Sequence, residues 1–377
     1  MLGPIDRRLA ERLRRWHHGH EGQCQGLRRQ RQGGAVPDRR RRTPVARQRQ
    51  AARADRPAPA RHDDAGHQRD QHHPELLPRL RPMTSDPRTR PIFILGRPSS
   101  RTALASAMIG GNPDTFAVPD INLFAEDRLE LVWSEMARLG QAHADGLVRT
   151  VACLYAGDQS IASVQMARRW VLRRYFWPIY KVFEELADKV APRRLVDRSR
   201  VYSVRKGAIE RILESYPDAQ FVHLVSHPAH AGTNPFARRP KPKDDAAKLA
   251  ADDWLETNRR LCNSLANVDE ANRVLVRLED LLGTPEGELA RISRAFGLRS
   301  DPAAIEAMMH PERSPFATVG PAGAPFGDDR AFLKDPVLRT ADAPRPDVPV
   351  DASLPDEISE LAAQFGYRTE AALYGHY

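Results

Sequence analysis

The feature that most constrains the fold is a short apolar run followed by hydroxyl and arginine residues, FILGRPSSRTAL at residues 93–104. Strand-favouring residues come first and helix-favouring residues follow, which predicts a strand, a loop and a helix in succession. Such a loop directs several backbone N–H groups and the positive end of the helix dipole to one point. The stretch therefore predicts an anion-binding loop. The alternative is a structural turn whose Ser and Thr residues cap the helix.

The rest of the chain continues this alternation of short apolar runs and longer helical stretches. Strands are predicted at 92–95, 194–196, 221–225 and 274–277. Helices are predicted at 102–109, within 125–139, across 159–190, and at 204–215, 246–267, 285–296 and 356–365. This pattern is typical of an α/β fold with a mostly parallel sheet. Residues 90–377 thus predict one α/β domain, in which the Pro- and Gly-rich stretch 314–343 forms a long surface loop.

Residues 1–82 differ in composition from the rest of the chain. They hold 20 arginines, no lysine and nine acidic residues, a net charge of about +11, whereas the remainder is close to neutral. This leader has too few apolar residues to offset its ordering entropy, so we expect it to be disordered. A nucleic-acid-binding arm and a targeting peptide are two interpretations. We favour a third, in which the leader is not native coding sequence and the protein begins at Met83, because this composition is typical of GC-rich DNA read out of frame.

Membrane and metal partners are not expected. No apolar run reaches the roughly 18 residues of a membrane span. The three cysteines, Cys24, Cys153 and Cys262, are far apart and form no CxxC pair, which predicts neither a disulfide framework nor a zinc site. We therefore expect a cytoplasmic protein without a metal. A nucleic-acid partner is expected only through the basic leader.

The loop at 96–103 differs from the phosphate loop of NTPases. That loop reads GxxxxGK[ST], and this chain lacks both the second glycine and the lysine. A kinase or ATPase is therefore the weaker enzyme alternative, and ATP-dependent transfer by the purified protein would support it.

Four motifs resemble, in order, those of the sulfotransferase family. The family's first strand leads into a loop like PRSGTT, which here reads PSSRTA at 98–103. A run like DKSP reads DRSR at 197–200, and a strand like FVHLVRHPRAV reads FVHLVSHPAHA at 221–231. A motif like RYEDL followed by a proline reads RLEDL at 277–281, with Pro285 after it. Four motifs in the right order make the resemblance specific.

A closer resemblance is to the sulfotransferases associated with polyketide and olefin synthesis. Their segment like LAGHPxLFCPPELHLL reads MIGGNPDTFAVPDINLF here, at 108–124. By this match Asp120 stands where the family has a glutamate, and Asn122 where it has a histidine. The sequence GDD at 327–329 resembles the family's GDP loop near the donor nucleotide. The resemblance implies a three-layer, P-loop-like α/β fold with a central parallel sheet flanked by helices.

The resemblance also implies an activity and a set of site residues. The activity is transfer of a sulfuryl group from the co-substrate 3′-phosphoadenosine 5′-phosphosulfate to a hydroxyl or amine of a small or carrier-bound acceptor. Asp120 and Asn122 occupy the implied catalytic positions, with Asp120 as the base. The implied donor-binding residues are Arg97, Pro98, Ser99, Ser100, Arg101, Thr102 and Ala103 in the loop, with Ser226 and Asn234 near the 3′-phosphate.

Several of these positions depart from the family pattern. The family's basic loop residue is Ser99 here, its glycine is Arg101, and the arginine that holds the 3′-phosphate is Ser226. Each charge-assisted phosphate contact contributes about 1.5–3 kcal/mol, so the enzyme interpretation requires substitutes such as Arg97 and Arg101. The alternative is a catalytically impaired binding protein with an altered or lost donor site. The acceptor and the oligomeric state stay open at this point.

Overall fold

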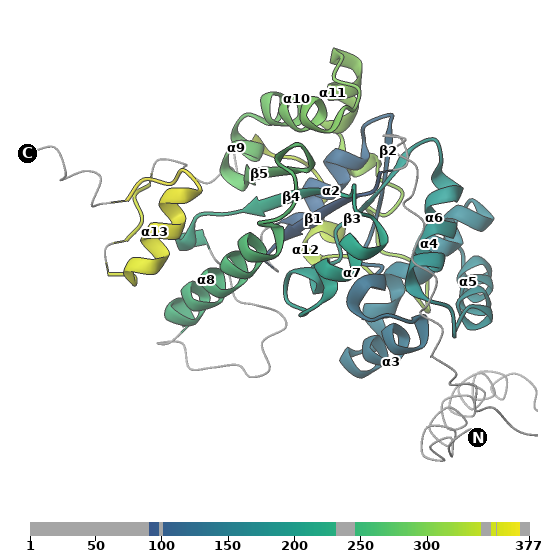
Figure 1. The fold of residues 1–377 in the computed structure, drawn as a ribbon. Coiled ribbons are helices and arrows are strands. Elements are labelled where there is room, and N and C mark those ends of the chain that lie inside the picture. The colour runs from purple at the N-terminus through teal and green to yellow at the C-terminus, as the bar shows by residue number, and fades with distance from the viewer. Residues whose placement is uncertain (1–89, 98–100, 231–245, 341–347, 352, 370–377) are drawn as a thin grey trace, which may run out of the picture. The chain divides into compact units, whose positions relative to one another are not determined.

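Five parallel strands form the centre of the structure, a computed structural model that describes residues 90–97, 101–230, 246–340, 348–351 and 353–369 (Figure 1). The strands are β1 (Ile92–Gly96), β2 (Thr115–Val118), β3 (Arg194–Asp197), β4 (Gln220–Val225) and β5 (Arg273–Arg277), in the spatial order β2-β3-β1-β4-β5. The described residues belong to one unit within 76–377. The predicted α/β fold with a parallel sheet is confirmed.

The central strand β1 pairs with β3 on one side and with β4 on the other. Ile92 is opposite Val196 of β3 and Gln220 of β4. All five β1 residues are buried. A parallel strand covered on both faces is expected to be apolar throughout, which explains why β1 was visible in the sequence.

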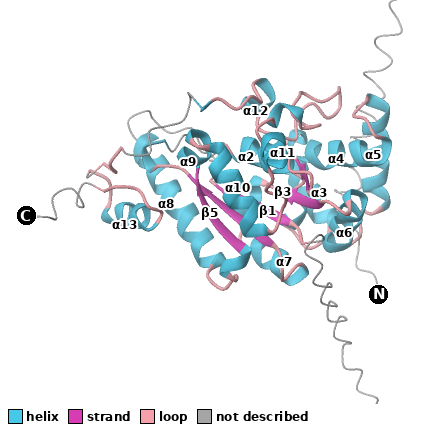
Figure 2. Cartoon of the chain, turned by 90° about the horizontal axis from the view of Figure 1, so that it is seen from above, coloured by secondary structure: helices cyan, strands magenta, loops and turns pink. Residues whose placement is uncertain are grey.

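Alternate β1 side chains enter two different hydrophobic cores, one on each face of the sheet. Phe93 and Leu95 pack in the first core and Ile92 and Ile94 in the second. The first core is covered by α3 (Leu129–Leu139), α4 (Asp145–Ala156), α5 (Ile161–Arg173), α6 (Ile179–Val190), α7 (Ala208–Ser215) and part of α8 (Ala246–Leu265). The second is covered by α2 (Thr102–Gly110), α9 (Leu278–Gly283), α10 (Pro285–Phe296), α11 (Pro302–Met308) and α12 (Arg330–Lys334). Figure 2 shows the strands enclosed by these helices.

The C-terminal helix α13 (Asp356–Gln364) forms a third, smaller core against α8 and the end of β4. Trp254 of α8 is fully buried there, with its ring 5.9 Å from that of Phe365. Val225, the last residue of β4, belongs to the same cluster. The C-terminal segment thus covers the strand end where Ser226 follows.

All the predicted strands are confirmed, and several helix boundaries are corrected. The sequence missed β2, and it missed the helices α4, α9 and α11. The helical region predicted across 159–190 contains two helices, α5 and α6. The predicted loop 314–343 contains the short helix α12. Among the described helices, none is both long and apolar enough to cross a membrane.

Candidate active site

Polar residues follow the carboxyl ends of the strands, which lie at one edge of a parallel sheet. Arg97 follows β1, Asp120 lies two residues after β2, Arg198 follows β3 and Ser226 follows β4. In open α/β sheets this edge is where ligands bind. The predicted site residues that the structure describes therefore come from neighbouring strand ends.

The loop after β1 is described at its two ends. Arg97 is almost fully buried, and its Nε donates a hydrogen bond of 2.6 Å to the carboxylate of Asp253 in α8. Pro98, Ser99 and Ser100 lie outside the described residues, so the predictions made for them are not addressed by the structure.

Arg101 ends this loop and is the N-cap of α2. It is exposed, and its backbone is left-handed, with φ 53° and ψ 33°. This conformation costs a non-glycine residue about 1–2 kcal/mol, which explains why the resembled motif has a glycine at this position. Its side chain makes no capping hydrogen bond. Thr102 and Ala103 are buried in the first turn of α2. The loop thus brings a solvent-facing guanidinium to the helix N-terminus.

A buried cluster of charges links the ends of β2 and β3. Arg198 is fully buried, and its guanidinium pairs with Asp120 at 3.1 Å and with Asp328. Arg200 binds the same Asp120 carboxylate, with Nη2 at 2.7 Å and the backbone N–H at 3.2 Å. Asp328 belongs to the GDD stretch at 327–329. Asp120 is therefore held by two arginines in the interior rather than in a surface turn.

The electrostatics of this cluster follow from burial and from the arginines. Burial alone raises the pKa of Asp120, but Arg198 and Arg200 more than compensate, so the pKa is lowered. Burial and the neighbouring Asp120 raise the pKa of Asp328, which Arg198 partly offsets. A carboxylate with a lowered pKa is a weak proton acceptor. The geometry therefore favours Asp120 as a residue that positions Arg198 and Arg200.

Asn122 is anchored to the backbone around it. Its Nδ2 donates to the carbonyl oxygens of Asp120 at 3.3 Å and His143 at 3.0 Å, and its backbone N–H donates to Ser199 Oγ at 2.8 Å. Ser199 in turn donates to Asp197 at 2.6 Å. The φ of Asn122 is 57°, a conformation that asparagine tolerates better than most residues. An amide cannot accept a proton at neutral pH, so Asn122 is not a base. Its hydrogen bonds instead connect the segment after β2 to His143 and Ser199.

Two glycines allow three segments to meet behind Asp120. A Cβ at Gly146, in α4, would lie 2.0 Å from the carbonyl oxygen of Asp120. A Cβ at Gly327, whose φ is 89°, would lie 2.4 Å from the backbone nitrogen of Gly146. The backbone N–H of Asp120 donates to the carbonyl of Gly327 at 2.9 Å. The GDD stretch is thereby fixed against the end of β2.

The end of β4 carries neutral and acidic groups. Ser226 is buried, and its carbonyl accepts a 2.7 Å hydrogen bond from the Trp254 indole. Glu279, also buried, accepts hydrogen bonds of 2.8 Å from the His227 backbone N–H and from the Tyr367 hydroxyl. Asn234 lies outside the described residues. Of the two residues predicted near the 3′-phosphate, the structure therefore describes Ser226.

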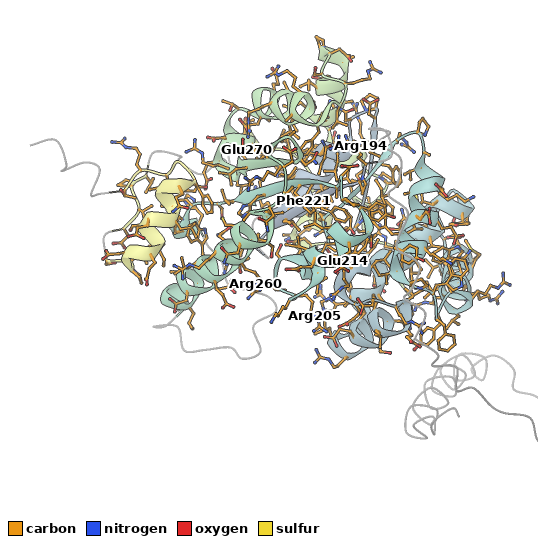
Figure 3. The ribbon with its side chains drawn as sticks, viewed as in Figure 1. Arg194, Arg205, Glu214, Phe221, Arg260 and Glu270 are labelled. Atoms are coloured by element: carbon orange, nitrogen blue, oxygen red, sulfur yellow. The ribbon has the colours of Figure 1, made fainter. Side chains whose placement is uncertain are left out.

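A cavity of about 570 Å³ opens beside Asp120 and Asn122. Its other walls come from α3, from α8, from His143 and from the segment before α7. Figure 3 shows two of its arginines, Arg205 from that segment and Arg260 from α8. His143 is half-buried there. Burial and Arg200 lower its pKa while Asp120 raises it, and the net direction is downward. Sequence reasoning missed His143, which belongs to no motif.

The described residues contain no group of three or more His, Cys, Asp or Glu side chains arranged to hold a metal ion. The polar groups at this edge are instead arginines, hydroxyls and paired carboxylates. Arginines and helix N-terminal N–H groups are suited to phosphate and sulfate groups. Together with the strand order, they define a P-loop-like α/β protein whose strand ends carry groups suited to an anion.

Comparisons with known proteins identify the family. A model of the sulfotransferase family matches residues 91–302, so the chain belongs to the sulfotransferase family, whose members typically use 3′-phosphoadenosine 5′-phosphosulfate as the sulfuryl donor. No curated protein matches the chain.

Two solved structures share the fold. The sulfotransferase domain from the curacin biosynthetic pathway is 20% identical, with a TM-score of 0.60, covering 74% of this chain and 99% of that one. The sulfotransferase domain from the Synechococcus PCC 7002 olefin synthase is 24% identical, with a TM-score of 0.58, covering 74% and 96%. The resemblance stated from the sequence is confirmed at the level of family and fold.

Proposed function

We propose that this chain transfers a sulfuryl group from 3′-phosphoadenosine 5′-phosphosulfate to a hydroxyl or amine of a small or carrier-bound acceptor. The observation that carries the proposal is the connection between β1 and α2. Arg101 is exposed there at the N-terminus of α2, and its backbone is left-handed. Strained backbone of this kind persists where a functional group must be placed, and an arginine at a helix N-terminus is suited to an anion.

The reaction needs positioning and charge stabilisation rather than covalent catalysis. The bond between sulfur and the 5′-phosphate oxygen breaks, a bond between sulfur and the acceptor oxygen or nitrogen forms, and the acceptor loses a proton. In our proposal the residues Arg97 to Ala103 bind the phosphosulfate. Ser226 and Asn234 lie near the 3′-phosphate, whereas Asp120 and Asn122 shape the acceptor side. The cavity beside Asp120 has room for a small acceptor.

A binding protein without transferase activity is the second candidate. The observation that favours it is the pairing of the buried basic groups with carboxylates: Arg97 with Asp253, and Arg198 and Arg200 with Asp120. An arginine that is already paired with a carboxylate has fewer N–H donors and less uncompensated positive charge with which to bind a phosphate. The two candidates therefore differ in how much donor affinity Arg101 supplies.

A transfer assay separates the two candidates. The full chain is incubated with donor carrying labelled sulfur and a panel of alcohols, phenols and amines, and label in the acceptor is measured. We expect transfer by the wild type and a loss of about tenfold or more in Arg101→Ala, because a charge-assisted phosphate contact is removed. Arg294→Ala, which removes an exposed arginine of α10, is the matched control. Donor binding without transfer to any acceptor would favour the binding protein, and neither binding nor transfer would refute the sulfotransferase proposal.

A further inference from the structure

The cavity beside Asp120 contains four carboxylates, and each of them contacts an arginine. Asp120 pairs with Arg198 and Arg200, and Asp253 pairs with Arg97 at 2.6 Å. The two glutamates of the cavity are also paired, Glu135 with Arg138 at 2.6 Å and Glu256 with Arg260 at 2.6 Å. Burial raises the pKa of Asp120, but Arg198 and Arg200 more than offset this, so Asp120 is a weak proton acceptor.

His143 is the imidazole that lines the same cavity. It lies in the 3₁₀ turn Gln141–Ala144 that precedes α4, and its backbone carbonyl accepts the 3.0 Å hydrogen bond from Asn122. This bond ties the turn to the segment that carries Asp120. The position of His143 in the cavity wall is therefore fixed by the site itself.

We propose that His143 is the general base that removes the acceptor's proton. The inference rests on the proposed function. In the step, an unprotonated ring nitrogen of His143 takes the proton of the acceptor hydroxyl as its oxygen bonds to sulfur. The sulfur–oxygen bond to the 5′-phosphate breaks, and the electron pair leaves with 3′-phosphoadenosine 5′-phosphate. An imidazole has the right proton affinity for this role near neutral pH.

Burial is the main influence that keeps the His143 ring neutral. Burial and Arg200 lower its pKa below the ordinary value of 6.5, and Asp120 raises it less. Glu135 of α3, Asp253, Glu256 and Arg260 of α8, and Arg205 are the other charged residues of the cavity. The rate should therefore fall as the pH drops through the lowered pKa, because the imidazole then becomes protonated. This acid limb should be absent in His143→Gln.

The test compares two acceptors that differ in their need for a base. An aliphatic alcohol must lose a proton during the reaction, whereas 4-nitrophenol is largely ionised in mildly alkaline buffer. With the full chain and labelled donor, we expect His143→Gln to lower kcat/KM about 10²-fold or more for the alcohol. For the phenol the loss should be less than about tenfold. His310→Gln, which removes a partly exposed histidine paired with Glu306 and Glu312, should leave both values unchanged.

Each contrary result has a distinct meaning. Equal losses for both acceptors, or no loss, in an active protein would overturn the role of His143 and leave the transferase proposal intact. A wild type that neither binds the product nucleotide nor transfers label would refute the proposed function and the base together. The NMR titration of the His143 ring gives an independent reading, since a pKa above neutrality would also overturn the proposal. Asp120→Asn should lower that pKa further, because Asp120 raises it.

Discussion

The two strands that flank β1 are followed by residues of different charge. On one side β3 is followed by Arg198 and Arg200, which are held by Asp120 and Asp328 in a buried network of charges. On the other side β4 is followed by Ser226, and the nearby Glu279 accepts hydrogen bonds from the His227 backbone N–H and the Tyr367 hydroxyl. The β3 side is rich in charge that is internally balanced, and the β4 side has little positive charge to offer.

This difference indicates that different residues at the sheet edge stabilise the fold and bind the donor. Buried arginines that are balanced by carboxylates stabilise the architecture and leave little charge for a ligand. A strand end without an arginine contributes hydrogen bonds at most. Donor affinity should then depend mainly on the loop between the two sides, where Arg101 is exposed at the start of α2.

The largest effect is expected from breaking the β3 network. Arg198→Met removes a fully buried guanidinium and leaves Asp120 and Asp328 without it, which should lower the free energy of unfolding by about 3–5 kcal/mol. Arg205→Met removes a partly exposed partner of Glu126 and should cost less than about 1 kcal/mol. Urea denaturation of the two variants measures both values. Similar losses in the two variants would show that the β3 network is not a structural element.

The next effect concerns the close packing behind Asp120. Gly146→Ala places a methyl group 2.0 Å from the Asp120 carbonyl oxygen, and relief requires backbone movement. We expect a loss of about 1–3 kcal/mol in the free energy of unfolding. Gly287→Ala in α10 is the matched control, since a Cβ there meets nothing within 4 Å and should stabilise the helix slightly. If thermal unfolding shows the same change for both, the contact is looser than the structure indicates.

A smaller effect separates strain from binding at Arg101. Arg101→Gly relieves the left-handed conformation and should raise the free energy of unfolding by up to about 1 kcal/mol. It should also weaken binding of 3′-phosphoadenosine 5′-phosphate about tenfold. Arg101→Ala should weaken binding equally without the gain in stability, because alanine keeps the strain. An unchanged affinity in both variants would mean that Arg101 does not contact the donor.

A further effect is a pH dependence of stability on the β2 and β3 side. Burial raises the pKa of Asp145 to about 6, although Phe326 N–H and two arginines oppose this. The unfolded chain therefore loses this proton first, and the free energy of unfolding falls as the pH rises from about 4 to about 6. Asp145→Asn removes this fall, so its stability relative to wild type should increase over that range.

A matched carboxylate should show the opposite sign. A hydrogen bond from Arg299 lowers the pKa of the exposed Asp301, so this ionised side chain stabilises the fold. Asp301→Asn should therefore lose stability relative to wild type as the pH rises. Denaturation curves at several pH values test both variants. Parallel curves for Asp145→Asn and wild type would contradict the raised pKa.

Much of the fold could be predicted from the sequence because buried parallel strands are continuous apolar runs. The runs at β1 and β4 show this, whereas β2 was missed. The motif at the end of the predicted strand β4 placed Ser226 where the structure has it, whereas Asp120 follows the unpredicted strand β2. The family followed from the order of these motifs.

The interactions within the site could not be predicted in the same way. The pair of Arg198 with Asp328 joins residues that are 130 positions apart, and its formation depends on how the GDD stretch packs on Gly146. The left-handed backbone of Arg101 conflicts with its residue type, so sequence preferences predict the opposite. His143 is a single histidine in a short turn, and only the cavity connects it to Asp120.

Calorimetric titration of the full chain with 3′-phosphoadenosine 5′-phosphate tests the central claim most directly. Adenosine 5′-monophosphate, which lacks the 3′-phosphate, and ATP serve as control ligands. Our account predicts micromolar binding of the product nucleotide, weaker binding of both controls, and a loss of affinity in Arg101→Ala. No binding, or equal binding of all three nucleotides, would contradict the claim that this chain keeps the donor site of a sulfotransferase.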